Sequence, residues 1–337
     1  MKIYFDYSLK NYNTFGIEAK AKQFVSVQSI DELTAVLAFN SDAKKFILGG
    51  GSNMLLTQDI DALVIHLNLK GIKIVDENKD YVWVESQAGE NWHKFVLWTI
   101  EHDFGGLENL SLIPGNVGTT PIQNIGAYGV EIKDTFVLCE AIHIETQELL
   151  IFKNETCKFG YRESIFKNEV KDEFIITSVI FKLTKRNHKL NTSYGAIETE
   201  LQLQNCTKPT IKDVSNAVIA IRKSKLPDPK ELGNSGSFFK NPVISKNEFE
   251  KIQNKFPEIP HYVVSDTEVK VPAGWLIEQA GFKGKRFGDA GIHKNQALVL
   301  VNYGNATGKE IWDVALTIQD TIYKTYGIKI ETEVNII

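Results

Sequence analysis

The spacing of apolar residues predicts several amphipathic helices along the chain. Ser29 and Glu32 have the spacing of a capping box, and an apolar stripe at Leu33, Val36 and Leu37 follows them. A second helix is expected near residues 91–101. Two further capping boxes, Thr210 with Asp213 and Thr307 with Glu310, open helices that end before Pro227 and at Gly327. The inward positions of these three helices are Trp92, Phe95, Val96 and Thr99; Val214, Ala217, Val218 and Ile221; and Ile311, Val314, Ile318 and Ile322.

Short runs of β-branched and aromatic residues predict strands at 45–48, 62–67, 81–84 and 174–181. The last residues alternate, with Ile328, Ile330, Thr332, Val334 and Ile336 on one face and Lys329, Glu331, Glu333 and Asn335 on the other. That alternation predicts a terminal strand over 328–336. From about 104 to 130 the pattern is typical of a glycine-rich loop.

Composition narrows the class of protein. The chain has 337 residues, of which 43% are hydrophobic and 24% charged, so it is globular and neither disordered nor fibrous. Its net charge is 38 − 42 = −4, which argues against a nucleic-acid partner held by bulk charge. The length suggests two or three domains.

The cysteines and the apolar runs point to a cytoplasmic protein. Cys139, Cys157 and Cys206 form no CxxC pair or disulfide framework, which suits a reducing compartment. No apolar run approaches the roughly 18 residues that a membrane span needs, and the first residues lack a signal-peptide core. No spacing of His, Cys, Asp and Glu indicates a metal site.

The run Gly49-Gly50-Gly51-Ser52-Asn53 directly follows the predicted strand at 45–48. Glycines there let backbone N–H groups approach an anionic ligand with no Cβ in the way. Met54 stands where a GxGxxG motif has its third glycine, and the GxxxxGK[ST] motif is also missing. A tight turn and a ligand-binding loop are equally compatible with this run alone.

The longer run from Gly105 to Gly129 carries many backbone amides, two side-chain amides (Gln123 and Asn124) and two hydroxyls (Thr119 and Thr120). Long irregular segments in compact domains tend to be functional, although an ordered loop without a ligand remains the alternative. Together, the two loops predict a bulky, non-covalently bound, dinucleotide-like ligand, and a flavin nucleotide fits that description.

With these two loops, the chain resembles the UDP-N-acetylenolpyruvoylglucosamine reductase family over nearly its whole length. The further segments that carry the resemblance are Asn13–Phe15, Phe159–Lys167, Arg222–Pro229, Gly233–Pro242, Ala273–Ile277 and Glu331–Val334. The segment Asn191–Gly195 is similar to the longer form of the family, which keeps a tyrosine-bearing loop over the substrate. The family often has alanine at the position of Ser235 and proline at that of Thr332.

The resemblance implies an α+β fold, the FAD-binding fold of the vanillyl-alcohol-oxidase type. Two α/β subdomains, 1–70 and 71–220, would hold FAD, and 221–327 would form an α/β substrate-binding subdomain. The terminal strand, 328–337, would return to the flavin. The residues expected to contact FAD are Gly49, Gly50, Gly51, Ser52, Asn53, Gly115, Asn116, Gly118, Thr119, Pro121, Gln123, Asn124 and Gly126.

The implied reaction is the reduction of UDP-N-acetylglucosamine enolpyruvate to UDP-N-acetylmuramate, a precursor of peptidoglycan. NADPH would reduce the non-covalently bound FAD, and the reduced flavin would pass a hydride to the terminal carbon of the enolpyruvyl group. The neighbouring carbon would then take a proton. The protein is also expected to be a monomer that binds no nucleic acid, membrane or metal.

Three residues would carry the chemistry. Arg162 would bind the carboxylate and stabilise the charge that develops on it, since a guanidinium keeps its own proton. Ser237 would donate the proton, with Lys240 or a bound water as a helper. Glu333, expected to be buried, would act near the carboxyl group. The residues that match substrate-contacting positions are Tyr128, Tyr194, Lys225, Asn241 and Gln296.

Without the resemblance, each of these side chains has an ordinary structural explanation. Arginines are mostly surface residues, a serine beside glycine usually bonds its own turn, and Glu333 reads as a solvated carboxylate. Two other functions stay open: a flavin oxidase of the same fold that uses oxygen, and a nucleotide-sugar-binding protein that has lost the flavin.

Overall fold

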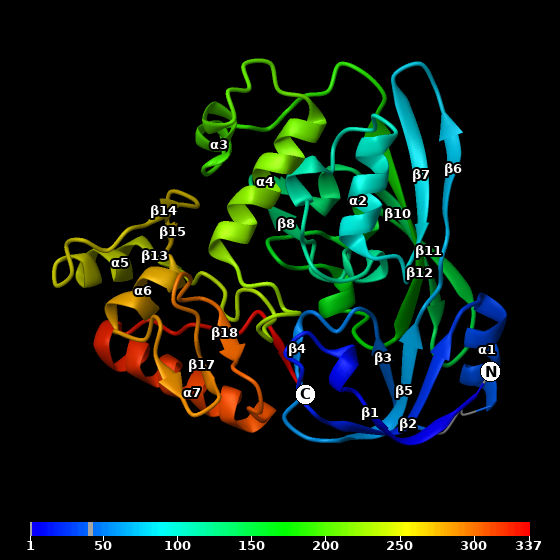
Figure 1. Ribbon diagram of the computed structural model, residues 1–337, viewed down its shortest axis with the longest axis horizontal. Coiled ribbons are helices and arrows are strands. Elements are labelled where there is room, and N and C mark those ends of the chain that lie inside the picture. The colour runs from blue at the N-terminus through cyan, green and yellow to red at the C-terminus, as the bar shows by residue number, and fades with distance from the viewer. Residues whose placement is uncertain (1, 40–42) are drawn as a thin grey trace. The chain divides into compact units, whose positions relative to one another are not determined.

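The computed structural model describes residues 2–39 and 43–337 (Figure 1). The contacts that residues make in space divide the chain into two compact units, each built from three stretches of sequence. Unit 1 contains the residues up to Tyr7, Ala21–Gly50 and Asp61–Arg222, and unit 2 contains Ser8–Lys20, Gly51–Ile60 and Lys223–Ile337. The division into three subdomains stays a prediction.

The first sheet of unit 1 has the strand order β1-β2-β5-β3 and carries helix α1 (Ile30–Phe39). Its strands are β1 (Tyr4–Ser8), β2 (Lys20–Val27), β3 (Lys45–Leu48) and β5 (Ile60–Leu67). β3 and β5 pair in parallel, and β3 ends directly before the Gly49–Asn53 run. Leu33, Val36 and Leu37, the predicted stripe of α1, are buried in the core of this region.

A second sheet in unit 1 is antiparallel, with the order β11-β10-β12-β7-β6. Its strands are β6 (Ile72–Glu77), β7 (Tyr81–Gln87), β10 (Phe136–His143), β11 (Leu149–Lys153) and β12 (Phe174–Thr184). Helix α2 (Trp92–Glu101) buries Trp92, Phe95, Val96 and Thr99, as predicted. The indole N–H of Trp92 donates to the carbonyl of Leu110 at 2.9 Å, which ties the glycine-rich loop to this core.

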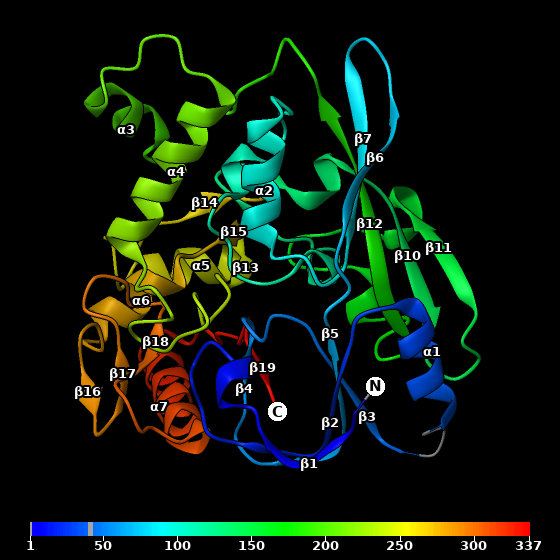
Figure 2. The same cartoon turned by 45° about the vertical axis from the view of Figure 1, so that its right-hand side comes forward.

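The rest of unit 1 holds a two-stranded hairpin and two helices. β8 (Gly126–Ala127) pairs with β9 (Val130–Glu131). Helices α3 (Ile197–Leu203) and α4 (Ile211–Lys225) lie side by side in both ribbon views and share an apolar cluster (Figures 1 and 2). Ser215 of α4 is hydrogen bonded to Ser111 at 2.8 Å, both buried, so α4 is also fastened to the glycine-rich loop.

Unit 2 consists of three small sheets and three helices. Its helices are α5 (Lys246–Gln253), α6 (Ala273–Gln279) and α7 (Gly308–Tyr326). Its strands are β4 (Met54–Leu55), β13 (Val243–Ser245), β14 (Tyr262–Val263), β15 (Glu268–Lys270), β16 (Arg286–Phe287), β17 (Ala290–Ile292), β18 (Leu300–Asn302) and β19 (Asn335–Ile336). The Thr307 and Glu310 box begins α7, and Gly327 ends it with a φ of 72°.

Two local predictions were wrong in detail. The terminal strand covers only Asn335–Ile336, although side-chain burial does alternate from Ile328 to Glu331. The end of the chain changes partners: 331–333 bonds to 238–240, and 335–337 to 53–55, so no single ladder can form. At α1, the Ser29 hydroxyl caps as expected, but the Glu32 carboxylate accepts the N–H of Gln28 rather than that of Ser29.

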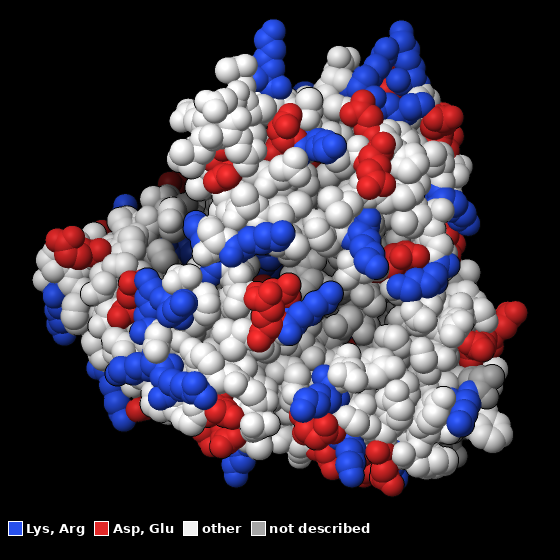
Figure 3. All heavy atoms as spheres, in the orientation of Figure 1, with Lys and Arg blue, Asp and Glu red and all other residues white. Residues whose placement is uncertain are grey.

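Basic and acidic side chains are interspersed over the face shown in Figure 3, and neither sign gathers into one patch there. This distribution matches the small net charge of −4. Binding of anionic ligands therefore depends on individually placed groups rather than on a surface field.

Candidate active site

The two glycine clusters meet in unit 1. A Cβ built on Gly49 would lie 2.7 Å from Cγ2 of Thr119, and one built on Gly50 would lie 3.0 Å from both Oδ1 of Asn116 and Cα of Gly115. Such distances leave no room for a side chain. The structure thus brings together two loops, 49–50 and 115–119, that sequence reasoning connected only through a shared ligand.

The Gly115–Thr119 turn is held by the strand-to-helix connection before α2. The N–H of Trp92 donates to the carbonyl of Gly115, and the N–H of Gly118 donates to that of Ala88, at 3.0 and 2.9 Å. A Cβ on Gly118 would lie 2.5 Å from that of Ala88. Packing within the protein therefore already explains the glycine at 118, while the turn keeps its shape for a ligand.

The third glycine of the first cluster belongs to unit 2. Gly51 adopts a φ of 59°, and a Cβ there would collide with the carbonyl oxygen of Tyr12. Its own carbonyl accepts the N–H of Thr14 at 3.0 Å. Next to it, Asn53 binds the end of the chain: its side-chain amide donates to the carbonyl of Glu333 at 3.3 Å. Ser52 is partly buried.

Among the remaining residues expected at the cofactor, Asn124 is committed to the protein itself. Its side chain is fully buried, donates to Glu131 and to the carbonyl of Gly160, and accepts the N–H of Lys133. It therefore shapes the loop, and any contact it makes to a ligand has to come from its backbone. Pro121 is buried and Gln123 partly buried in the same loop.

Arg162 is fixed on the hairpin that follows this loop. Its Nη2 donates to the carbonyl of Gly126 at 2.6 Å, and its guanidinium lies 5.4 Å from the ring centre of Tyr161. Its φ of 57° is unusual for a residue other than glycine. Strain of this kind persists where surrounding contacts impose it and is common at functional sites.

Ser237 and Glu333 are neighbours in unit 2. The N–H of Glu333 donates to the carbonyl of Phe238 at 2.8 Å, directly after Ser237. The Ser237 hydroxyl makes no hydrogen bond to any residue in the described ranges. Glu333 is partly buried, so the expectation of full burial was wrong. Nζ of Lys240, the suggested helper, lies 3.5 Å from Oε2 of Glu331.

Tyr128 and Tyr194 lie on segments of unit 1 that Asn109 connects. Asn109 is 1% exposed, and its side-chain amide donates to the carbonyls of Tyr128 and Asn191 at 3.1 and 2.8 Å. Tyr194 is 59% exposed. Tyr128 has a φ of 51°, and burial raises the pKa of its hydroxyl.

The other three substrate candidates belong to unit 2. Lys225 is the exposed last residue of α4. Oδ1 of Asn241 accepts the N–H of Ala273 at 2.9 Å, at the start of α6, and Oε1 of Gln296 accepts that of Leu298 at 3.4 Å. Each carbonyl oxygen thus orients its amide group, whose NH₂ can then donate to a sugar or a base.

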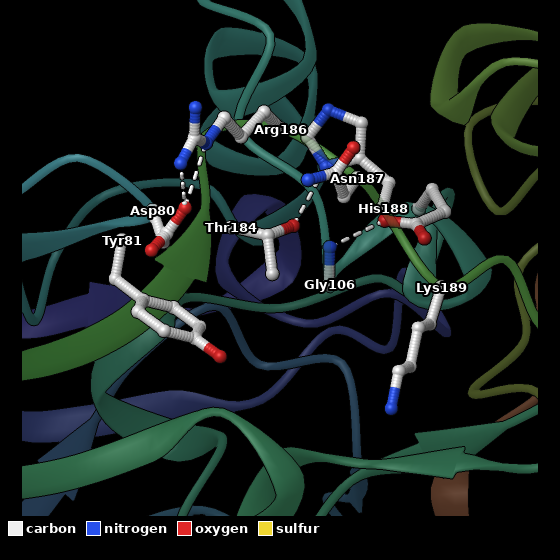
Figure 4. A pocket seen from close by; sticks show the side chains of 9 residues that line it. Asp80, Tyr81, Gly106, Thr184, Arg186, Asn187, His188 and Lys189 are labelled. Atoms are coloured by element: carbon white, nitrogen blue, oxygen red, sulfur yellow. Dashed lines mark hydrogen bonds and ion pairs between the residues drawn. The ribbon is translucent and has the colours of Figure 1, made fainter.

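Unit 1 also has a pocket of about 370 Å³ where the ends of β7 and β12 meet the Gly105–Gly106 turn (Figure 4). Arg186 and Asp80 form an ion pair on one side, and the Thr184 hydroxyl is bonded to the ring of His188 on the other. None of the residues expected at the active site lines it. Within the described ranges, no three His, Cys, Asp or Glu side chains gather to hold a metal ion, and no helix is long and apolar enough to cross a membrane.

Sequence reasoning did not single out two residues that interact with Tyr128, Asn109 and Arg222. Asn109 carried no signal, because an asparagine in a polar loop is unremarkable. Arg222 did carry one: it lies four residues after Val218 and eight after Val214, on the apolar stripe of α4.

The glycine loops fit a flavin nucleotide. Loops 49–50 and 115–119 pack together with no room for a Cβ on Gly49 or Gly50, so only backbone lines this cradle at the two glycines. A family described as "FAD binding domain" matches residues 21–146, which contain this cradle. An α+β fold with an FAD-binding domain, the class expected from the sequence, is thus confirmed, and the protein is an FAD-dependent oxidoreductase.

Known relatives define the family. The description "UDP-N-acetylenolpyruvoylglucosamine reductase, C-terminal domain" matches residues 228–337. Proteins named UDP-N-acetylenolpyruvoylglucosamine reductase are 74% identical in Flavobacterium johnsoniae, over all of both chains, and 47% identical in Pseudomonas putida, over 98% of this chain and 97% of that one. The chain belongs to the UDP-N-acetylenolpyruvoylglucosamine reductase family. A crystal structure of that enzyme from Thermus caldophilus, 24% identical, has a similar fold, with a TM-score of 0.67 over 99% of this chain and 98% of that one.

Proposed function

We propose that this protein reduces UDP-N-acetylenolpyruvoylglucosamine to UDP-N-acetylmuramate, with NADPH as the reductant, in peptidoglycan synthesis. Its kinship with relatives of that name, at 74% identity over the whole chain, is the observation that carries the proposal. When bound, FAD accepts a hydride from NADPH and returns it to the enolpyruvyl carbon. The monomeric state and the cytoplasmic location expected from the sequence are part of this proposal.

Arg162 binds the carboxylate of the enolpyruvyl group. Because Nη2 donates to the carbonyl of Gly126 and Nη1 to that of Asn124, the planar guanidinium is held in one orientation. Negative charge that develops on the carboxylate during the reaction meets a charge already in place, so little reorganisation is needed.

Ser237 donates the proton to the carbon that bears the carboxylate. Its hydroxyl has no partner in the described part of the chain, so the O–H is available to a substrate. Glu333, held beside it through Phe238, is the group next to this step that can share or replace the proton. The backbone hydrogen bond between 238 and 333 supports a joint action of the two residues.

The remaining substrate contacts come from two tyrosines, a lysine and two side-chain amides. Tyr128 and Tyr194 belong to unit 1, whereas Lys225, Asn241 and Gln296 belong to unit 2. Lys225 meets the diphosphate as a point charge, and the two amides, oriented by Ala273 and Leu298, donate to the sugar or the base.

The deciding experiment follows the two half-reactions separately. Anaerobic NADPH should bleach the bound FAD, and the UDP-enolpyruvyl sugar should then restore its colour with formation of UDP-N-acetylmuramate. A flavin that NADPH does not reduce would favour an oxidase, and a protein that cannot be loaded with FAD would favour a binding protein. Reoxidation by oxygen alone, with no effect of the sugar, would contradict the proposal.

A further inference from the structure

Arg222 has no task in the proposed reaction, yet its position is unusual for an arginine. It lies in the last turn of α4 and continues the stripe of Val214 and Val218, which are both fully buried. Its Nε atom is buried and has no hydrogen-bond partner. An unsatisfied donor on a cationic group is costly in such a place, so its presence calls for an explanation.

Two other arginines of this chain, Arg186 and Arg286, are neutralised by a carboxylate. Nε of Arg186 lies 2.6 Å from Oδ1 of Asp80, and Nη2 of Arg286 lies 2.8 Å from Oδ1 of Asp289. In the ranges that the structure describes, no carboxylate forms an ion pair with Arg222. Burial lowers the pKa of Arg222, but a guanidinium still keeps its proton at neutral pH. The charge is therefore present and lacks a counter-charge.

Tyr128 packs against the apolar cluster of α3 and α4 that includes Val214 and Val218. Its hydroxyl is the hydrogen-bond and charge partner of the Arg222 guanidinium. Because burial raises the pKa of Tyr128, the phenol stays protonated at neutral pH. Its oxygen accepts from Arg222 and its own O–H is left to donate, since no residue in the described ranges accepts it. The pair thus offers a positive charge and a hydroxyl donor side by side, which is what an oxyanion needs.

The position of Tyr128 connects this pair to the proposed chemistry. Two residues before it, the carbonyl of Gly126 accepts Nη2 of Arg162. Tyr128 itself has a left-handed backbone, with a φ of 51°, which the hydrogen bond from Asn109 to its carbonyl helps to hold. Two arginines, from different parts of unit 1, therefore converge on the turn that follows Asn124.

We propose that Arg222 and Tyr128 together bind an oxyanion of the sugar-nucleotide substrate, either its carboxylate or its diphosphate. The inference rests on the proposed function, which supplies the anion. The incoming oxyanion would accept hydrogen bonds from the Arg222 guanidinium, whose Nε is buried without a partner, and from the Tyr128 O–H. Before the substrate binds, the hydrogen bond between the two side chains keeps the guanidinium in position.

The test measures binding by calorimetry to the oxidised FAD-loaded enzyme without NADPH, so that no turnover occurs. In Arg222→Met, the Kd of the UDP-enolpyruvyl sugar should rise about tenfold to a hundredfold, as expected for the loss of a charged hydrogen bond. UDP-N-acetylglucosamine, which has the diphosphate but no carboxylate, separates the two sources. If Arg222→Met loses affinity for UDP-N-acetylglucosamine to the same extent, the pair binds the diphosphate. If its affinity for UDP-N-acetylglucosamine is unchanged, the pair binds the carboxylate.

Tyr128→Phe removes a single oxygen atom and should raise the same Kd about fivefold to tenfold. In the double variant the loss should not exceed that of Arg222→Met alone, because both residues act on one group. Should Arg222→Met not fold, Tyr128→Phe tests the same pair. Arg186→Met is the matched control: it removes an arginine of unit 1 that Asp80 already neutralises, and binding should not change.

Unchanged affinity of Arg222→Met for the UDP-enolpyruvyl sugar would overturn the inference. The inference would also be overturned if Arg222→Met lost FAD, or lost the reduction of FAD by NADPH, but bound the sugar normally after reconstitution with FAD. Arg222 would then serve the flavin and not the sugar. Failure of the proposed function looks different: the wild-type protein would neither bind nor reduce the sugar.

Discussion

Arg162 in unit 1 and Ser237 in unit 2 are held in opposite ways. Arg162 is anchored through its own side chain, by the hydrogen bond from Nη2 to the carbonyl of Gly126 at 2.6 Å. At Ser237 the backbone of the next residue provides the anchor: Phe238 donates to Leu298 and accepts from Glu333, both at 2.8 Å, while the serine hydroxyl has no partner in the described part of the chain.

The difference follows from what each group has to do. A cation that stabilises a developing charge works best with a fixed direction, so a hydrogen bond to its own guanidinium helps it. A proton donor has to give its hydrogen to the substrate, and an internal acceptor would compete for that hydrogen. Orientation through the neighbouring backbone avoids the competition.

The largest expected effect concerns the hydroxyl in unit 2. Ser237→Ala should slow reoxidation of the reduced flavin by the enolpyruvyl sugar about 10²- to 10⁴-fold, since general acid catalysis is lost. Flavin reduction by NADPH should not change, and stopped-flow absorbance of the flavin measures both. Ser235→Ala is the control, because Ser235 is bonded to Thr14 and the carbonyl of Met54. Normal reoxidation in Ser237→Ala would remove Ser237 from the mechanism.

In unit 1, Arg162→Lys keeps the charge but loses the planar fork. We expect kcat for the enolpyruvyl sugar to fall about 10²-fold, with flavin reduction by NADPH intact, because a lysine cannot both bond Gly126 and grip a carboxylate. Steady-state kinetics with NADPH in excess measures the effect. A variant with a raised KM and a normal kcat would show that Arg162 binds the ground state only.

Asn109 tests whether the turn of unit 1 depends on side-chain anchors. Asn109→Leu leaves the partly buried carbonyls of Tyr128 and Asn191 without their donor, which should cost about 2–3 kcal/mol of unfolding free energy. Denaturant titration measures the loss. Asn191→Ala, which removes a bond to the exposed Gly129, should cost less than about 1 kcal/mol. Equal costs would contradict the role assigned to Asn109.

Thr332 and Lys240 test the backbone anchor of unit 2. The pairing of 238–240 with 331–333 uses the N–H groups of Lys240 and Glu333, but not that of Thr332. Thr332→Pro should therefore change the unfolding free energy by no more than about 1 kcal/mol. Lys240→Pro removes the bond to the carbonyl of Glu331 and should cost about 1–3 kcal/mol. If thermal denaturation showed a larger loss of stability for Thr332→Pro than for Lys240→Pro, this strand register would be refuted.

Glu108 gives the smallest effect, a dependence of stability on pH. Burial raises the pKa of this carboxyl group, which is 3% exposed, despite the hydrogen bond from the N–H of Gly106. The folded state therefore holds the proton more tightly than the unfolded state, and its stability falls as pH rises from the unfolded pKa through the folded pKa. Between those two pKa values, the melting temperature of Glu108→Gln should fall less with rising pH than that of the wild-type protein. An unchanged pH profile would contradict the shift.

Much of the fold could be predicted from local pattern. The bounds of β3 and the buried residues of α2, α4 and α7 follow from periodicity and capping boxes, which act within a few residues. The terminal strand could not be predicted, because an alternating pattern does not reveal that its backbone partner changes between Glu333 and Asn335.

For the site, the sequence by itself determined which chemical groups are available: glycine-rich loops, a cation at 162, a serine at 237 and the family to which they belong. Only the tertiary structure decided how those groups are used. It committed Asn124 to the protein. Among the described residues, it left the Ser237 hydroxyl without a hydrogen-bond partner and set Arg222 beside Tyr128 without an ion-paired carboxylate. The physical reason is that hydrogen-bond partners and counter-charges come from residues far apart in the chain, so their presence or lack is a property of the folded packing alone.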